Sequence, residues 1–187
     1  TGRYTDDINL RRQTHVFFLR SDVAHGSLTG VDTSAAEDMP GVLKIFTGAD
    51  FAEIGGMPCG WQITDKHGQP MQEPKHPVLA HEKVRHVGEP IAAVVAETLE
   101  QARDAAEAID LEIDELPAVV DMKAAVAEGA PKVHDELTSN LCYDWGFVEE
   151  NKGAVEEAFA KAAHVTTLEL RNNRLVANPM EPRVAVG

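Results

Sequence analysis

The sequence contains few cysteines and few aromatic residues, and both shortages limit the classes of protein to which it can belong. Two cysteines occur among 187 residues, so a densely cross-linked secreted scaffold is excluded. Cys59 and Cys142 permit one disulfide, but two free thiols in a reducing compartment are the simpler interpretation. We expect Cys59 in an exposed loop and Cys142 in a strand core. Because aromatic residues make up only 5% of the chain, its core must be built mainly from Ala, Val, Leu and Ile.

Basic residues and long hydrophobic runs are also scarce. Lys and Arg number 17 against 31 Asp and Glu, a formal net charge of −14, and such a surface repels nucleic-acid phosphates and anionic membranes. The longest apolar run, residues 91–96, is far shorter than the roughly 20 residues that span a bilayer. The chain starts without Met and without a hydrophobic signal segment. We therefore expect a cytoplasmic chain cut from a longer protein, with no nucleic-acid partner and no membrane contact.

Motifs for several common chemistries are missing. There is no H-E-x-x-H, paired C-x-x-C, G-x-S-x-G, Walker A loop or G-x-G-x-x-G in the sequence. His76, His81 and His86 recur at intervals of five, a spacing that aligns them on neither a helix face nor a strand face. Solvated or locally bonded histidines are therefore the expected state, and we predict no metal or nucleotide site in this segment.

The apolar patterns that are present predict an α+β domain. Strands are expected at residues 15–20, 26–32, 42–47, 91–96, 111–114 and 165–170. Helices are expected from Ser34 and over residues 98–109, because Ser34 with Glu37 and Thr98 with Gln101 have the capping-box spacing. The second of these helices would bury an apolar stripe of Leu99, Ala102, Ala105, Ala106 and Ile109. Further helices are expected over residues 121–127 and over residues 153–163, the last with its cap near Asn151 and with Val155 and Phe159 on its inner face. The first helix lies between two strands, an order that fits a β-α-β unit.

Residues 55–77 are rich in Gly and Pro and predict a long irregular loop. Long loops in compact domains are usually functional or disordered. Met57 and Trp61 lie in this loop and favour docking against another surface, because a freely solvated loop rarely carries both.

Two short motifs leave alternatives open. Glu181 has the least solvent-like sequence setting of any carboxylate, and it either pairs with Arg183 to anchor a loop or lies near a substrate or cofactor pocket. Residues 87–90, V-G-E-P, predict a structural turn into the next strand. The other interpretation places Gly88 against a cofactor-bearing neighbour.

Several motifs, taken in order, resemble the opening of one enzyme family. They are Gly2 with residues 4–8, residues 19–21 with Ala24-His25, residues 31–34 with Ala36, residues 40–42, residues 87–96, residues 116–121, Phe159 with Ala162, Asn173-Arg174 and residues 180–183. Together they are similar to the molybdenum-binding large subunit of the xanthine dehydrogenase, aldehyde oxidase and aerobic carbon monoxide dehydrogenase family. The resemblance covers nearly the whole chain.

This resemblance implies a fold and a domain boundary. Residues 1–135 would form an α/β hammerhead domain, a mixed sheet with helices packed on it. Residues 136–187 would form a linker and the first strand or strands of the molybdopterin-binding domain. The family's enzymes hydroxylate aldehydes, purines and other N-heterocycles, or oxidise carbon monoxide, with oxygen derived from water. The complete enzyme would use a molybdenum–molybdopterin cofactor, 2Fe-2S clusters and FAD, and we expect this segment to bind none of them.

The family's glycine-rich loop, its arginine segment near the metal and its general-base glutamate have no counterpart in the sequence. The resemblance therefore assigns no catalytic residue, and a fragment inactive alone is expected. It places the loop with Met57, Cys59 and Trp61 along the substrate entrance, and it places Glu181 and Arg183 near the molybdenum site. Gly88 completes this predicted periphery.

The resemblance also implies partners. These are the rest of the molybdopterin-binding domain and the iron–sulfur and FAD subunits or domains. An exposed strand edge in the tail would pair with the hammerhead or with a second copy in a homodimer. The alternative function is a non-catalytic, stand-alone hammerhead scaffold from a split gene.

Overall fold

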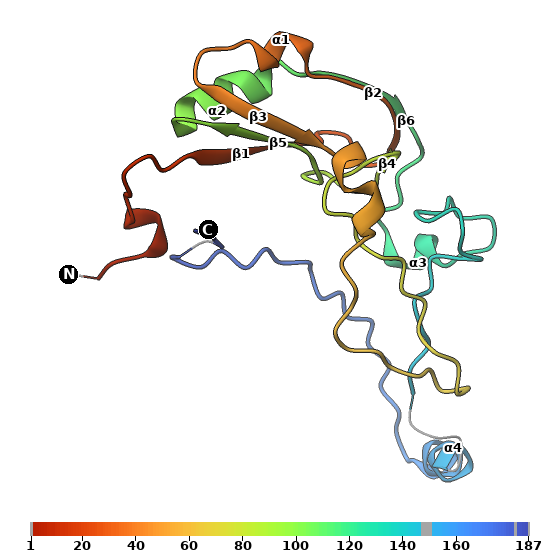
Figure 1. Cartoon of the computed structure of the whole chain (residues 1–187). Coiled ribbons are helices and arrows are strands. Elements are labelled where there is room, and N and C mark those ends of the chain that lie inside the picture. Colours follow the sequence, from red (N-terminus) through yellow and green to blue (C-terminus); the bar gives the residue numbers. More distant parts are fainter. Residues whose placement is uncertain (1, 147–150, 182, 187) are drawn as a thin grey trace. The chain divides into compact units, whose positions relative to one another are not determined.

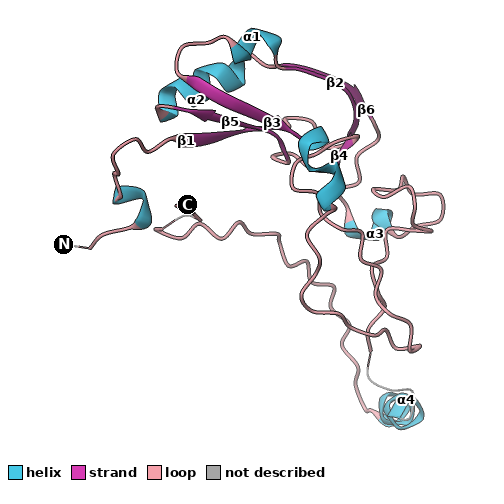
Figure 2. Ribbon diagram, viewed as in Figure 1, coloured by secondary structure: helices cyan, strands magenta, loops and turns pink. Residues whose placement is uncertain are grey.

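The computed structural model describes residues 2–146, 151–181 and 183–186. By their contacts they form two units: residues 14–146 make up the larger, and the residues before and after this range make up the smaller. The larger unit contains every strand of the described chain (Figure 2). The boundary expected after residue 135 stays a prediction.

The elements follow one another closely in the larger unit. They are β1 (His15–Arg20), β2 (Gly26–Asp32), α1 (Ser34–Glu37), β3 (Val42–Thr47), the 3-10 helix η2 (Gly48–Ile54), β4 (Lys83–Val84), β5 (Pro90–Ala96), α2 (Leu99–Glu107), β6 (Asp110–Glu115) and α3 (Met122–Ala125) (Figure 1). The smaller unit contains the 3-10 helix η1 (Thr5–Asp7) and α4 (Lys152–Lys161). None of the helices in the described ranges has both the length and the apolar character that crossing a bilayer requires.

The strands form two three-stranded sheets, in the orders β1-β5-β3 and β4-β2-β6, and each of these pairings is antiparallel. The expected order of strand, short helix and strand is present as β2, α1 and β3. However, β2 and β3 belong to different sheets, so the expected β-α-β unit does not form. The connection of residues 33–41 is shorter than the dozen or so residues that a parallel crossover needs.

β5 is the central strand of the first sheet. The prediction of a strand covered on both faces is confirmed, because Ile91, Ala92, Val94 and Ala96 are all fully buried. Ala92, Val94 and Ala96 pack in one cluster with the alanines of α2. Ile91 packs in a second cluster with Ala80 and Val84. A continuous apolar run is typical of parallel sheets, but here the two-sided cover surrounds an antiparallel strand.

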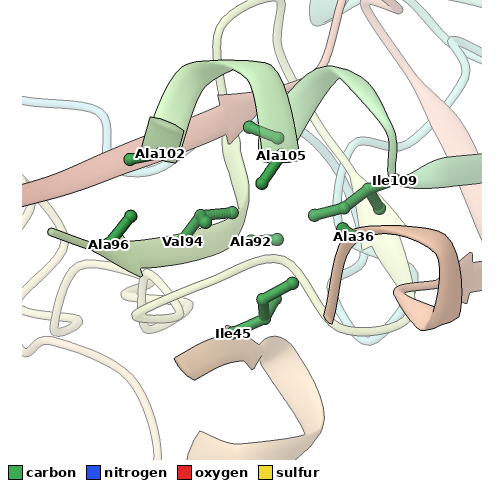
Figure 3. Close-up of a cluster of buried hydrophobic side chains, with 9 residues drawn as sticks. Ala36, Ile45, Ala92, Val94, Ala96, Ala102, Ala105 and Ile109 are labelled. Atoms are coloured by element: carbon green, nitrogen blue, oxygen red, sulfur yellow. The ribbon is translucent and has the colours of Figure 1, made fainter. Parts of the chain in front are cut away.

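α2 packs on this sheet through small side chains (Figure 3). Ala102 and Ala105 are fully buried in one cluster with Val94, and alanine lets the helix lie close to the strands. The start of the helix is capped as predicted. The Thr98 hydroxyl accepts a hydrogen bond from the Gln101 amide at 3.2 Å, and the Gln101 side chain accepts one from the Thr98 amide at 3.0 Å.

Two local predictions in the larger unit were wrong. The cap of α1 is Thr33 rather than Ser34, and its hydroxyl donates to the Glu37 carboxylate at 2.6 Å. Both cysteines are free and exposed, which confirms two thiols and the position of Cys59 but corrects that of Cys142. Cys142 lies in an irregular segment, where the alternation of apolar residues has no sheet to join.

The smaller unit differs more from the prediction. α4 follows Asn151 as its N-cap, as expected, but the expected inner-face residues Val155 and Phe159 are exposed. Residues 165–170 form no strand, and neither this run nor the rest of the described tail pairs with another segment as a strand. A strand needs a neighbour to satisfy its backbone, and the described part of the chain supplies none here.

We predict that Ile45→Ala lowers the free energy of unfolding by about 2–5 kcal/mol, because it leaves a cavity in the cluster beneath α2. Ile45 is 7% exposed, whereas Leu43 on the same strand is 54% exposed. Leu43→Ala is therefore the matched control, with an expected change below about 0.5 kcal/mol. Urea denaturation followed by circular dichroism measures both, and equal losses would contradict the assignment of the core.

Candidate functional site

The loop of residues 55–77 folds back on itself as an irregular hairpin. The Met71 amide donates to the Ile63 carbonyl at 3.0 Å, and the Asp65 amide donates to the Gln69 carbonyl at 2.8 Å. At the tip, the Asp65 carboxylate accepts a hydrogen bond from the Gln69 amide at 2.8 Å. This bond is the main reason that the pKa of Asp65 lies below its ordinary value. A charged carboxylate thus closes the turn.

A distant segment, residues 141–146, holds this hairpin from the side. The Gln72 amide donates to the Cys142 carbonyl at 2.8 Å, and the Lys66 amide donates to the Asp144 carbonyl at 2.9 Å. The Lys66 ammonium also lies 2.5 Å from the Asp144 carboxylate, and the Cys142 thiol donates to the Gln72 carbonyl at 3.0 Å. The predicted loop is therefore a built structure.

The three loop residues expected at a substrate entrance lie together at the base of this hairpin. The Glu73 carboxylate accepts a hydrogen bond from the Cys59 amide, and the Cys59 thiol donates to the Trp61 carbonyl at 3.1 Å. Trp61 is 79% exposed and Met57 is 55% exposed. An ordered backbone thus presents large apolar side chains that the described chain does not cover, and their role at an entrance stays a prediction.

The V-G-E-P motif forms a structural turn around a buried carboxylate. Glu89 is 1% exposed, and its Oε2 accepts a hydrogen bond from the Arg85 amide at 2.5 Å. The Ser21 amide donates to the Glu89 carbonyl at 2.9 Å, and the Gly88 amide donates to the Ser21 carbonyl at 2.7 Å. Gly88 has a φ of 87°, a conformation that favours glycine. These contacts support the structural alternative for this motif.

The two tail residues of the predicted periphery lie in the smaller unit. Glu181 was expected in a poorly solvated setting, but it is exposed, and Met180 beside it is exposed as well. Its Oε1 accepts hydrogen bonds from the amide and the hydroxyl of Thr5, at 2.9 and 3.1 Å. Arg183 is exposed as well.

A polar pocket in the larger unit was missed by the sequence motifs. It is a cavity of about 320 Å³ between η2, residues 75–85 and residues 134–136. Its charged and titratable lining consists of Lys75, His81, Glu82, Arg85, His134 and Glu136. No motif with a fixed spacing predicts a pocket from residues so far apart in the sequence. The recurring histidines, of which His81 lines the pocket, were a weak indication of it. In the described ranges, no group of three or more His, Cys, Asp or Glu side chains is placed to hold a metal ion.

The charges in this pocket are coupled. The Nδ1 atom of His134 lies 3.5 Å from the Glu136 carboxylate. Burial is the main reason that the pKa of His134 lies below its ordinary value, and the positive charge of Arg85 adds to this, while Glu136 and Glu89 oppose it. His134 is therefore neutral at neutral pH, and Arg85 is a permanent cation of the pocket.

We expect His134 to titrate below its ordinary value of 6.5 in an NMR titration. Arg85→Gln should raise that pKa, because it removes a nearby positive charge, and Arg103→Gln, on the outer face of α2, should leave it unchanged.

The same shift affects stability. Since the folded pKa is the lower one, the unfolded state binds more protons as the pH falls below about 7. The contribution of His134 to the free energy of unfolding should therefore decrease as the pH falls through this range and stay constant below the folded pKa. His134→Gln should flatten the slope, and a slope unchanged in this variant would contradict the assignment.

Comparison with known proteins gives a consistent result. Residues 1–117 match the family model described as aldehyde oxidase and xanthine dehydrogenase, a/b hammerhead domain. The nicotine 6-hydroxylase large subunit of Paenarthrobacter nicotinovorans is 36% identical over 182 residues, which cover 97% of this chain and 21% of that protein. The xanthine dehydrogenase molybdenum-binding subunit of Escherichia coli O157:H7 is 34% identical over 72% of this chain and 18% of its own length.

Solved structures agree. Quinoline 2-oxidoreductase from Pseudomonas putida 86 superposes with a TM-score of 0.68 and 38% identity, over 75% of this chain and 17% of that chain. The chain thus spans about a fifth of the length of the curated relatives. The resemblance inferred from the sequence motifs and the expected fold class are confirmed: the chain belongs to the aldehyde oxidase and xanthine dehydrogenase family and contains its α/β hammerhead domain.

Proposed function

We propose that this chain is the hammerhead part of a molybdenum hydroxylase large subunit and is inactive alone. The observation that carries the proposal is the combination of a family match over residues 1–117 with coverage of only 21% of the nicotine 6-hydroxylase large subunit. The complete enzyme oxidises an aldehyde, an N-heterocycle or carbon monoxide with oxygen derived from water. The hammerhead contributes a structural wall to that enzyme.

The cofactors belong to other parts of the complete enzyme. The described residues offer no clustered set of metal-ligating side chains, so this segment does not fit a metal group and no reaction step is assigned to it. The molybdenum–molybdopterin cofactor lies in the remainder of the large subunit, and the 2Fe-2S clusters and FAD lie on partner subunits or domains. The names of the relatives describe subunits of larger assemblies, which supports this division. The two free thiols fit a reducing cytoplasm.

The exposed loop supplies the substrate entrance in this proposal. Met57, Cys59 and Trp61 share one ordered segment, and the side chains of Met57 and Trp61 lie largely uncovered. Large exposed apolar side chains mark surfaces that contact a partner or a ligand. Glu181 and Arg183 lie near the molybdenum site of the complete enzyme in this proposal. Gly88 shapes a turn rather than touching a cofactor.

Intact mass and metal analysis of the natural protein test the proposal. We expect a polypeptide about five times longer than this chain, since the chain covers 21% of a relative, and we expect it to contain molybdenum. The 187-residue chain expressed alone should oxidise no aldehyde with an artificial electron acceptor. A natural protein of this size without molybdenum would instead support the stand-alone scaffold.

In the complete enzyme, Trp61→Ala should raise KM several-fold and change kcat little, because the side chain is proposed to guide the substrate rather than to react. Val120→Ala is the control, since Val120 is equally exposed, at 75% against 79%, but lies outside the loop. Steady-state kinetics on the enzyme's own substrate measure both variants. An unchanged KM for Trp61→Ala would contradict the proposal that the loop lines the substrate entrance.

A further inference from the structure

Arg85 is a cation whose hydrogen-bonding capacity is mostly unused. A guanidinium carries five N–H donors. In the described structure Nη1 donates to the Lys83 carbonyl at 3.4 Å, a long and weak bond. The buried Nε has no hydrogen-bond partner. Leaving a buried donor unpaired costs free energy, so the guanidinium has a strong preference for an acceptor.

The position of Arg85 is fixed by its surroundings. Its amide donates to the buried Glu89 carboxylate at 2.5 Å, and the turn that carries Glu89 is bonded through its backbone to Ser21. The base of the side chain is therefore held in place before any ligand arrives. Such preorganisation reduces the entropy that binding would otherwise cost.

The lining of the pocket selects the kind of acceptor. Lys75 contributes a second positive charge, and Glu82 and Glu136 contribute negative charges, the latter beside His134. The two carboxylates disfavour a dianion such as phosphate more than a monoanion. A guanidinium binds a planar carboxylate through two parallel hydrogen bonds. A single carboxylate therefore fits this pocket better than a phosphate does.

The rest of the cavity favours a small apolar body on that carboxylate. Phe51, Val78 and Leu79 line it alongside the charged groups. Its volume of about 320 Å³ lies at the lower end of the range of about 300–1,000 Å³ that is common for small-molecule sites.

We propose that this cavity, the Arg85 pocket, binds a carboxylate attached to a small apolar group. The carboxylate occupies the unused donors of Arg85, and the apolar group lies against Phe51, Val78 and Leu79. The carboxylate comes either from a free small molecule or from an Asp or Glu side chain of further polypeptide. This inference does not depend on the proposed function, because it rests on the geometry of the larger unit alone.

Benzoate is the probe, titrated into the 187-residue chain and followed by two-dimensional NMR of the backbone amides. We expect saturable shifts at residues that line the pocket. Arg85→Gln should weaken binding about tenfold or more, since hydrogen bonds to charged groups are the strong ones. Glu136→Gln should tighten binding a few-fold by removing a repelling charge. Arg103→Gln deletes the same charge outside the pocket and should change nothing.

Several results would overturn the proposal. They are the absence of saturable shifts with the unmodified chain, equal affinity of Arg85→Gln, or an equal loss in Arg103→Gln. If the circular dichroism signal shows that Arg85→Gln does not fold, then the affinities of Arg85→Lys and Glu136→Gln for benzoate test the proposal instead. Arg85→Lys keeps the positive charge but cannot form two parallel hydrogen bonds to a carboxylate. It should therefore bind benzoate less tightly than the unmodified chain. An unchanged affinity would contradict a bidentate site.

A second arm separates the two sources of the carboxylate. If a side chain of further polypeptide fills the pocket, benzoate should bind the 187-residue chain but not the complete large subunit. If the ligand is a free small molecule, benzoate should bind both with similar affinity.

Discussion

The burial of β5 on both faces is the constraint on which the larger unit depends. In the first sheet β5 lies between β1 and β3 and pairs with both. One face of this strand meets the alanines of α2, and its first apolar residue, Ile91, packs with Ala80 and Val84 in a second cluster. A chain with 5% aromatic residues has few large side chains to bridge layers, so close contact between small residues has to stabilise them.

The turn before β5 links this core to the polar pocket. Glu89 ends the turn as a buried carboxylate, and the amide of Arg85 is one of the groups that satisfies it. A buried charge is tolerated only where it is paired or hydrogen-bonded. The residues that stabilise the entry into β5 thus also place the guanidinium of Arg85 beside an open cavity. Packing in the core and the geometry of the pocket have the same origin.

The described chain leaves several large apolar side chains uncovered. The loop of residues 55–77 is ordered by its bonds to residues 141–146, yet Trp61 remains 79% exposed. In the smaller unit, Val155 and Phe159 of α4 are exposed too. Large exposed apolar side chains mark surfaces that contact a partner or a ligand, and the chain spans about a fifth of its curated relatives. Both observations support the proposal that the loop lines a substrate entrance in a longer protein.

Local patterns in the sequence determined the elements whose partners lie nearby or whose signals are strong. The Thr98–Gln101 cap, the alanine stripe of α2 and the apolar run of β5 were all predictable, and ordered motifs were sufficient for the family. Tertiary structure alone decided the separation of β2 and β3 into two sheets and the absence of a strand at residues 165–170. It also decided the meeting of Arg85 with His134. The physical reason is that strand pairing and pocket assembly depend on contacts between segments far apart in the sequence. A local pattern of residues does not determine which of these segments come into contact.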